Sequence, residues 1–150
     1  MYQRSEILRS RFLLIPTLGL AALLLSGCAY DEPIRIHSDD LRLEFDHRLY
    51  SRIVAVDPAS GATKSLGPFS PTETLATENE EYSEFQTDSQ EWTEVSDAIG
   101  EGQKVVLEGS NSVLRKQVAI TTYADFPRTA ILRVTYTNVS EESLTLKGWT

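Results

Sequence analysis

The feature that most constrains the fold of this chain is a two-residue alternation of apolar and polar side chains after residue 28. Between residues 130 and 137, one row of side chains is apolar and the row between is largely polar (Ala130, Leu132, Val134 and Tyr136 against Ile131, Arg133, Thr135 and Thr137). Residues 41–46 and 114–120 show the same alternation. This period is typical of half-buried strands, and no stretch after residue 28 shows a helical period. The pattern predicts an antiparallel all-β sandwich, with Leu132 and Val134 buried.

Turn residues divide these strands. Asp57-Pro58-Ala59-Ser60-Gly61 predicts a turn between a strand at 53–56 and a returning strand at 63–66. We expect one strand, bulged, from Tyr82 to Thr93, and a turn bracketed by Gly100 and Gly102. Val105 and Leu107 mark a short strand, and a last strand begins at Leu144 and is still running at Thr150. The sandwich is therefore expected to be incomplete at its C-terminus, with a final strand that would favour aggregation if nothing paired with it.

The N-terminus has the parts of a bacterial secretory signal. Arg4, Arg9 and Arg11 precede the apolar run 12–25, which is too short to remain as a membrane-spanning helix. Leu25-Ser26-Gly27-Cys28 then resembles a lipobox, in which the Cys28 thiol is alkylated with a diacylglyceryl group before cleavage between Gly27 and Cys28. We expect a signal peptide over 1–27, a lipidated tether over 28–33 and a β-sandwich over 34–150. The alternative is an ordinary secretory signal followed by an unrelated cysteine.

Export has consequences for the mature domain. Cys28 is the only cysteine, so lipidation leaves no disulfide and the apolar core must hold the domain. Several acyl chains anchor stably where one does not, and the lipoprotein resemblance implies three. Ala29 follows the lipidated residue, where an aspartate would indicate retention in the inner membrane. The expected location is the cell envelope, with the outer membrane favoured.

The charge of the mature chain excludes some partners. Removing residues 1–27 takes away three arginines and one glutamate, which leaves 11 basic and 21 acidic residues and a formal charge of −10. Such a surface argues against nucleic-acid binding and against electrostatic docking on anionic lipid, so the membrane contact rests on the acyl chains. Ten carboxylates and no lysine or arginine lie between Lys64 and Lys104. A calcium site there lacks the expected loop spacing, and a solvated loop and sheet face is the preferred interpretation.

The chain offers no catalytic signature. It has no Gly-rich phosphate loop, no nucleophile elbow and no metal-spaced His/Cys set, and His37 and His47 are more typical of isolated histidines than of metal ligands. We therefore expect no catalytic residue, no metal and no cofactor. Tyrosine and tryptophan side chains stack on sugars at many binding sites. Trp92, which lies among Gln90, Glu91, Thr93 and Glu94, is the candidate sugar contact, although core packing is the alternative for any aromatic residue.

Three segments resemble a known family. They are residues 41–55 (LRLEFDHRLYSRIVA), 66–75 (LGPFSPTETL) and 123–138 (YADFPRTAILRVTYTN), together with Gly148-Trp149-Thr150. They look like the N-terminal β-supersandwich of bacterial α-galactosidases (melibiases) of glycoside hydrolase family 36. The resemblance covers roughly residues 34–150 and rests on strand and turn phrases.

The resemblance implies a fold and a setting but no catalytic residues. Family enzymes carry their aspartate nucleophile and acid/base on a (β/α)8 barrel that follows this sandwich, and none of that barrel is present in the sequence. We therefore expect a non-catalytic, carbohydrate-associated sandwich of a lipid-anchored α-galactosidase-like glycoside hydrolase, which binds sugar or a catalytic barrel domain. The alternative is an envelope lipoprotein that acts as a structural or protein-interaction module.

Overall fold

The computed structural model describes residues 32–150, in which every regular element is a β-strand. Gly27, Cys28 and the expected signal peptide lie outside the described residues, as does most of the tether. Within residues 32–150 no helix is long and apolar enough to cross a membrane. The all-β prediction is confirmed.

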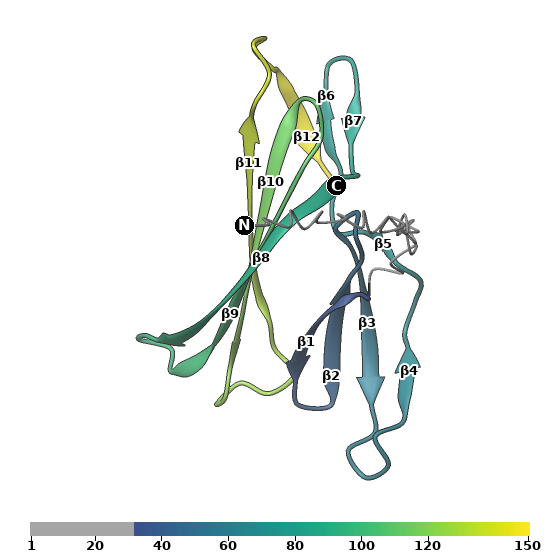
Figure 1. The fold of residues 1–150 in the computed structure, drawn as a ribbon, viewed down its shortest axis with the longest axis vertical. Coiled ribbons are helices and arrows are strands. Elements are labelled where there is room, and N and C mark those ends of the chain that lie inside the picture. The colour runs from purple at the N-terminus through teal and green to yellow at the C-terminus, as the bar shows by residue number, and fades with distance from the viewer. Residues whose placement is uncertain (1–31) are drawn as a thin grey trace, which may run out of the picture.

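The strands form three antiparallel sheets (Figure 1). The first has the order β1 (Ile34–Ser38), β2 (Leu41–Phe45), β3 (Tyr50–Val56), β4 (Thr63–Ser65), with β5 (Ser70–Pro71) also paired to β3. The second has the order β11 (Ile131–Asn138), β10 (Leu114–Tyr123), β9 (Glu101–Ser110), β8 (Gln86–Ser96). A small sheet joins β12 (Leu146–Trp149), β6 (Leu75–Thr77) and β7 (Glu81–Tyr82). The final strand is thus paired, since β12 lies against β6 and Thr150 exchanges two backbone hydrogen bonds with Thr74.

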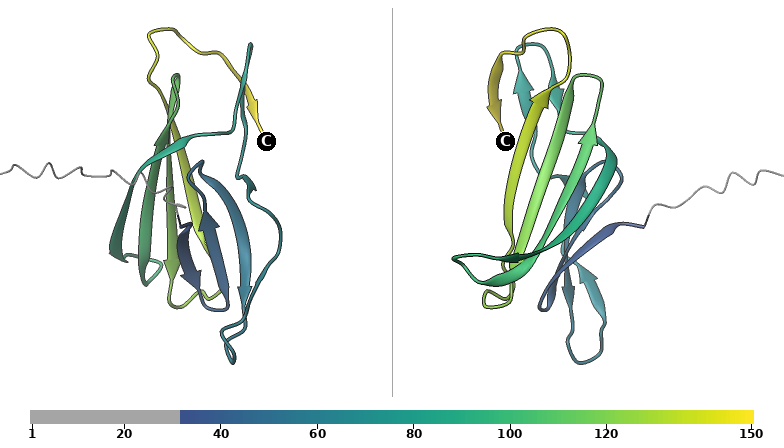
Figure 2. Two further views of the ribbon diagram at one scale, coloured as in Figure 1. Left: turned by 45° about the vertical axis from the view of Figure 1, so that its right-hand side comes forward. Right: turned by 60° about the vertical axis from the view of Figure 1, so that its left-hand side comes forward.

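The first and second sheets face each other as two layers (Figure 2). The apolar row of each alternating segment points toward the space between the two layers, as the sequence pattern predicts. Alternate residues of a strand share one face, and residues opposite each other on neighbouring strands share it too. The core between the layers takes side chains from both sheets, from β6, from the turn before β3 and from the connection before β8 (Ile36, Phe45, Leu49, Leu75, Phe85, Val105, Leu107, Leu114, Val118 and Ile120). All of these belong to the described residues, so the segment 32–150 has a core of its own.

The predicted hairpin at 57–61 is confirmed. β3 and β4 pair, and the N–H groups of Asp57 and Gly61 donate to the carbonyls of Ala62 and Asp57 at 2.8 Å each. The Asp57 carboxylate accepts from the Ala59 N–H and the Ser60 hydroxyl. Gly61 has a φ of +70°, a conformation that residues with a Cβ rarely adopt. The turn chemistry in the sequence therefore specified this connection locally.

The prediction that Leu132 and Val134 of β11 are buried is wrong in degree. Val134 is only partly buried, and Leu132 is 39% exposed although it lies on the inward-facing row. The reason is that β11 is the edge strand of its sheet and pairs only with β10 among the described strands. The facing layer does not extend far enough to cover it.

The acidic middle of the chain also differs from the prediction. The single strand expected over 82–93 is two elements, β7 and β8, and the buried Phe85 lies between them. The expected bulge is present in β8, between Thr87 and Ser89. Gly102, expected at a turn, lies inside β9. A Cβ added at this position would come 2.2 Å from the Thr122 carbonyl oxygen. The close approach of β9 and β10 requires a glycine at this position.

Candidate functional site

Trp92, the candidate sugar contact, lies on the inward face of the second sheet. It is opposite Val105, which is buried, so both side chains point to the same side of the sheet. β8 is the outer strand of this sheet, and here its inward row passes beyond the core. As a result Trp92 is 45% exposed. Core packing therefore accounts for only part of this side chain.

The neighbours of Trp92 on this row are polar. Gln90 lies opposite Leu107 and Glu94 lies opposite Gln103, so Gln90, Trp92 and Glu94 follow one another along the same face of β8. Gln103 is the diagonal cross-strand neighbour of Trp92, a relation that typically separates Cα atoms by about 7–8 Å. An indole ring flanked by amide side chains is thus available to solvent.

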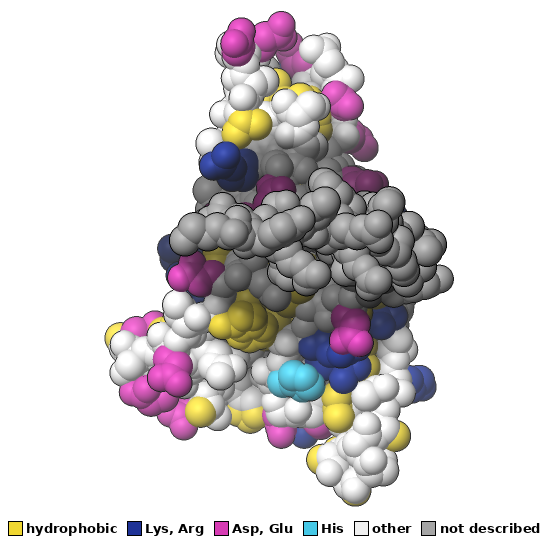
Figure 3. Space-filling view, in the orientation of Figure 1, with side chains coloured by type: hydrophobic (Ala, Val, Ile, Leu, Met, Phe, Trp, Pro, Cys, Tyr) yellow, Lys and Arg dark blue, Asp and Glu magenta, His cyan; other side chains and the backbone are white. Residues whose placement is uncertain are grey.

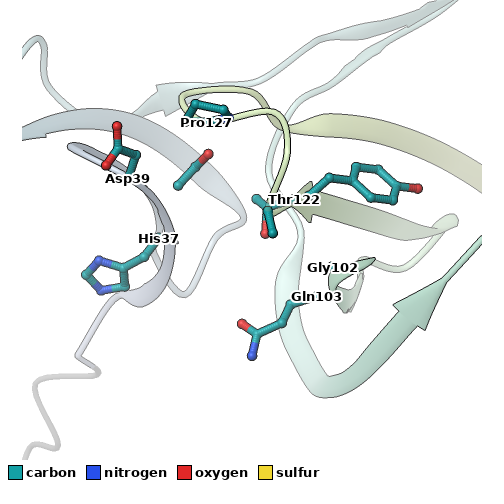
Figure 4. A pocket seen from close by; sticks show the side chains of 9 residues that line it. His37, Asp39, Gly102, Gln103, Thr122 and Pro127 are labelled. Carbon is teal, nitrogen blue, oxygen red and sulfur yellow. The ribbon is translucent and has the colours of Figure 1, made fainter. Parts of the chain in front are cut away.

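A cavity of about 560 Å³ lies at one end of this row. Its walls come from three segments that are far apart in the sequence: the end of β1, the start of β9, and the end of β10 with its loop. Figure 4 shows His37 and Asp39 on one wall, Gly102, Gln103 and Thr122 on the other, and Pro127 in the loop that closes the space between them. From the β9–β10 wall, Gln103 and Thr122 supply an amide and a hydroxyl, whereas the His37 ring on β1 is turned away from that wall (Figure 4).

A hydrogen bond braces the β9–β10 wall of this cavity. The Tyr123 hydroxyl donates to Asp97 Oδ2 at 2.8 Å, and the Ile99 N–H donates to Asp97 Oδ1 at 2.8 Å. The backbone bond from Ile99, with the Tyr123 bond, lowers the pKa of Asp97. The Asp97 hydrogen bond raises the pKa of Tyr123, which remains a neutral donor. These groups fasten the β8–β9 hairpin to β10 and so set the shape of the wall.

A second cavity, of about 270 Å³, lies at the other end of the row. It is lined by the start of β1, the turn after β2, and the start of β8, from Gln86 to Gln90. The Thr87 N–H and hydroxyl both donate to the His47 carbonyl oxygen, at 2.9 and 3.0 Å, and so tie the turn to β8. We call the two cavity linings and the row between them (Gln90, Trp92 and Glu94) the β1–β8 face.

The composition of the β1–β8 face indicates which ligands it could take. Most of its hydrogen-bonding side chains are neutral amides and hydroxyls (Ser38, Gln86, Thr87, Ser89, Gln90, Gln103 and Thr122). Its charged groups are mainly carboxylates (Glu32, Asp39, Asp46, Asp88 and Glu94). In Figure 3 acidic side chains also gather over the β8–β9 hairpin. A neutral polyhydroxylated ligand suits this chemistry, whereas a polyanion would be repelled.

The two histidines do not come together. His37 lines the larger cavity and His47 the smaller one. Among residues 32–150, no group of three or more His, Cys, Asp or Glu side chains is arranged to hold a metal ion. The acid-rich segment between Lys64 and Lys104 is mostly exposed, in agreement with the solvated interpretation, although Glu73 is an exception.

Two charged clusters were not foreseen from the sequence. Glu44, on the outer face of the first sheet, is 1% exposed and contacts three guanidinium groups, those of Arg42 at 2.8 Å, Arg52 at 2.6 Å and Arg35 at 3.5 Å. Desolvation pushes the pKa of Glu44 up, but the hydrogen bond from Arg52 and the charges of Arg42 and Arg52 outweigh it, and the net shift is downward. This carboxylate is therefore stabilised in its charged form.

The second cluster lies within the core. Lys116 is fully buried, and its Nζ is 2.7 Å from Glu73 Oε1. The approach does not have the angles of a hydrogen bond, so the contact is an ion pair. The Tyr136 hydroxyl donates to the same oxygen at 2.6 Å. Cross-strand register alone could have placed Lys116 beside Tyr136, but no local pattern connects either residue to Glu73, which precedes β6.

Comparisons with protein-family models, with curated proteins and with solved structures find no match to this chain. The family resemblance of the strand and turn phrases therefore remains an expectation.

Proposed function

We propose that this chain is a non-catalytic, carbohydrate-associated β-sandwich of a lipid-anchored envelope protein, corresponding to the front of an α-galactosidase-like glycoside hydrolase. The observation that carries the proposal is the position of Trp92. A half-exposed indole ring lies in a row with Gln90 and Glu94, between two cavities lined by amides, hydroxyls and carboxylates. A tryptophan ring offers an apolar plane to a sugar face, and amides and hydroxyls bond to the sugar hydroxyls.

The chemistry of the described acids supports a binding role over hydrolysis. Glycoside hydrolysis requires a carboxyl group with a raised pKa as the general acid. The carboxyl groups whose pKa is shifted, Glu44, Asp57 and Asp97, are all shifted downward. In the proposed role, the catalytic carboxylates belong to a separate barrel domain, and this sandwich contacts the same glycan beside it.

The attachment of the domain follows from the N-terminal motif. In this proposal the thiol of Cys28 carries the acyl chains, residues 29–33 are the tether, and β1 begins at Ile34. A tether of five residues spans at most about 18 Å when fully extended. The β-sandwich would therefore lie close to the membrane, with the outer membrane favoured by Ala29.

The test is a titration of residues 32–150 with neutral oligosaccharides, in which calorimetry and tryptophan fluorescence measure the binding. A panel of galactosides, glucosides and mannosides covers the class. Trp92→Ala is expected to weaken binding of the best ligand at least tenfold, which corresponds to about 1.4 kcal/mol. Trp149→Ala is the matched control, because Trp149 is 76% exposed on β12, outside the β1–β8 face, and is expected to leave the affinity unchanged.

Two results would contradict the proposal. One is the absence of binding by every neutral glycan in the panel. The other is turnover of nitrophenyl glycosides that persists after repurification and is lost when a single Asp or Glu is replaced, because that would assign the chain to the enzymes.

A specific observation also favours the second candidate, a protein-interaction lipoprotein. Large apolar side chains are exposed on β11 and β12 and beside them (Ile131, Leu132, Val139, Leu146 and Trp149). Apolar side chains left exposed at and beside a sheet edge offer contact area to a protein partner. This role is compatible with sugar binding, because these strands are not part of the β1–β8 face.

A further inference from the structure

β11 leaves one side of its backbone unpaired. It pairs with β10 over eight successive residues without a register shift, and with no other described strand. The Val139 N–H donates to the Val113 carbonyl just beyond this ladder. Because hydrogen-bonded pairs alternate along an antiparallel ladder, the N–H and C=O groups of Leu132, Val134 and Tyr136 point away from β10. A straight row of donors and acceptors is therefore open to a further strand.

An apolar crevice opens beside the same edge. It has a volume of about 330 Å³ and lies between the two layers, where Leu41, Leu43 and Ile53 face Ala130 and Leu132. Ile53 is 48% exposed, although it points inward. A strand added to β11 would lie about 4.8 Å further out and would place its inward side chains over this crevice. The free edge and the uncovered crevice thus both correspond to one missing strand.

The local charge of this edge differs from that of the rest of the chain. Residues 126–140 contain no aspartate or glutamate, in a protein that has 22 of them. The outward row of β11 carries one charged group, that of Arg133. Two copies of this strip could therefore approach without the repulsion that the acidic remainder of the surface would cause.

We propose that β11 pairs antiparallel with β11 of a second copy of this chain, about a two-fold axis through Val134. This axis brings the open backbone groups of Leu132 and Tyr136 opposite each other and pairs Val134 with itself. On the outer face Arg133 then lies opposite Thr135, and Ile131 lies opposite Thr137, so no like charges meet. The interface is self-complementary and closes as a dimer, and the two four-stranded sheets become one sheet of eight strands.

The proposal is tested by measuring the oligomeric state of residues 32–150 by sedimentation at protein concentrations from about 1 to 100 μM. The expected result is a concentration-dependent equilibrium between monomer and dimer. Leu132→Lys places a charge on the inward row of the edge, a substitution that natural edge strands use against pairing, and is expected to leave only monomer. Leu66→Lys is the matched control, because Leu66 is also exposed but follows β4, and it should preserve the dimer.

A second measurement makes the test independent of the variants. In the wild type, the amides of Leu132, Val134 and Tyr136 should exchange with deuterium more slowly as the protein concentration rises, whereas amides in β4 should not change. A wild type that remains monomeric over the whole range overturns the proposal. So does a dimer that survives Leu132→Lys in a variant with an unchanged circular dichroism spectrum, and so does open-ended association beyond the dimer.

Discussion

Removing one partner of the buried ion pair between Lys116 and Glu73 should lower the free energy of unfolding more than replacing both charged groups with uncharged ones. At 2.7 Å and an effective dielectric constant of about 20, the attraction between the two charges is about 6 kcal/mol. Desolvation of a fully buried ammonium group costs several kcal/mol, so the net contribution of the pair is small. Removing the carboxylate alone removes the attraction but leaves the desolvation cost. We therefore expect Glu73→Gln to lower the free energy of unfolding by about 3–5 kcal/mol.

The surroundings of the two groups predict an asymmetry between the partners. The Lys116 ammonium lies 5.4 Å from the centroid of the Phe85 ring and 6.0 Å from that of Tyr136, among apolar neighbours with no solvent access. Glu73 is 15% exposed and keeps its hydrogen bond from Tyr136, whose pKa is raised by burial and by this bond, so that the hydroxyl remains protonated. Lys116→Met should therefore cost about 1–2 kcal/mol, less than Glu73→Gln.

The double variant Lys116→Met/Glu73→Gln separates this explanation from a simple loss of contacts. It removes both charges, so it should be more stable than Glu73→Gln alone, because no unpaired ammonium is left in the core. Unfolding in urea, followed by far-UV circular dichroism and by fluorescence, measures all four proteins. The wild-type domain is expected to have about 5–15 kcal/mol of stability, which gives enough range for these differences.

A surface ion pair of equal length is the control. Lys147 Nζ and Glu78 Oε1 are also 2.7 Å apart, but both side chains are 55% exposed. Exposed pairs contribute about 0–1 kcal/mol, so Glu78→Gln should barely move the urea midpoint. The reasoning is refuted if Glu73→Gln and Glu78→Gln have equal effects, or if the double variant is no more stable than Glu73→Gln.

Three further predictions concern separate parts of the chain. The pKa of Glu44 lies below its ordinary value of 4.5, so its ion pairs stabilise the fold above that pH and the contribution is lost as the pH falls through the lowered pKa. Urea midpoints should therefore drop less in acid for Glu44→Gln than for the wild type, and equal drops would count against this. Gly102→Ala forces a Cβ to within 2.2 Å of the Thr122 carbonyl oxygen and should cost about 1–3 kcal/mol or more in urea unfolding. Gly148→Ala, which meets no atom within 4 Å, should not lower stability, and similar losses in both variants would show that crowding is not the cause. The processed wild type should carry the mass of acyl chains on Cys28, and Cys28→Ala should not; mass spectra without that difference would refute lipidation.

Sequence reasoning was most successful where the information is local. The alternation at residues 41–45, 114–120 and 130–136 identified three strands and the face that each turns inward, because neighbouring side chains of a strand point to opposite sides. The turn at 57–61 was predicted from its own residues, which hydrogen-bond to one another. The solvated character of most of the acidic segment followed from its composition.

What the sequence missed depends on which strands become neighbours. Leu132 was expected to be buried, but β11 lies at a sheet edge, and edge position is decided by the order of the strands. Lys116 occupies an inward position of β10 and is compatible with the core only because Glu73, brought in from before β6, supplies the opposite charge. Trp92 is 45% exposed, and the residues that line the cavity beside it come from β1, β9 and β10, which no local pattern around Trp92 indicates.

The division between what the sequence determined and what the tertiary structure decided has a physical basis. Alternation and turn chemistry act over two to five residues, so the amino-acid sequence by itself determined the strand class, the inward faces and the 57–61 hairpin. Strand order, edge positions and the cavities arise from contacts between residues far apart in the chain, whose free energies depend on the packing of both layers at once. Only the tertiary structure therefore decided that Trp92 lies between two polar cavities, that the ammonium of Lys116 is paired in the core, and that β11 has an open edge.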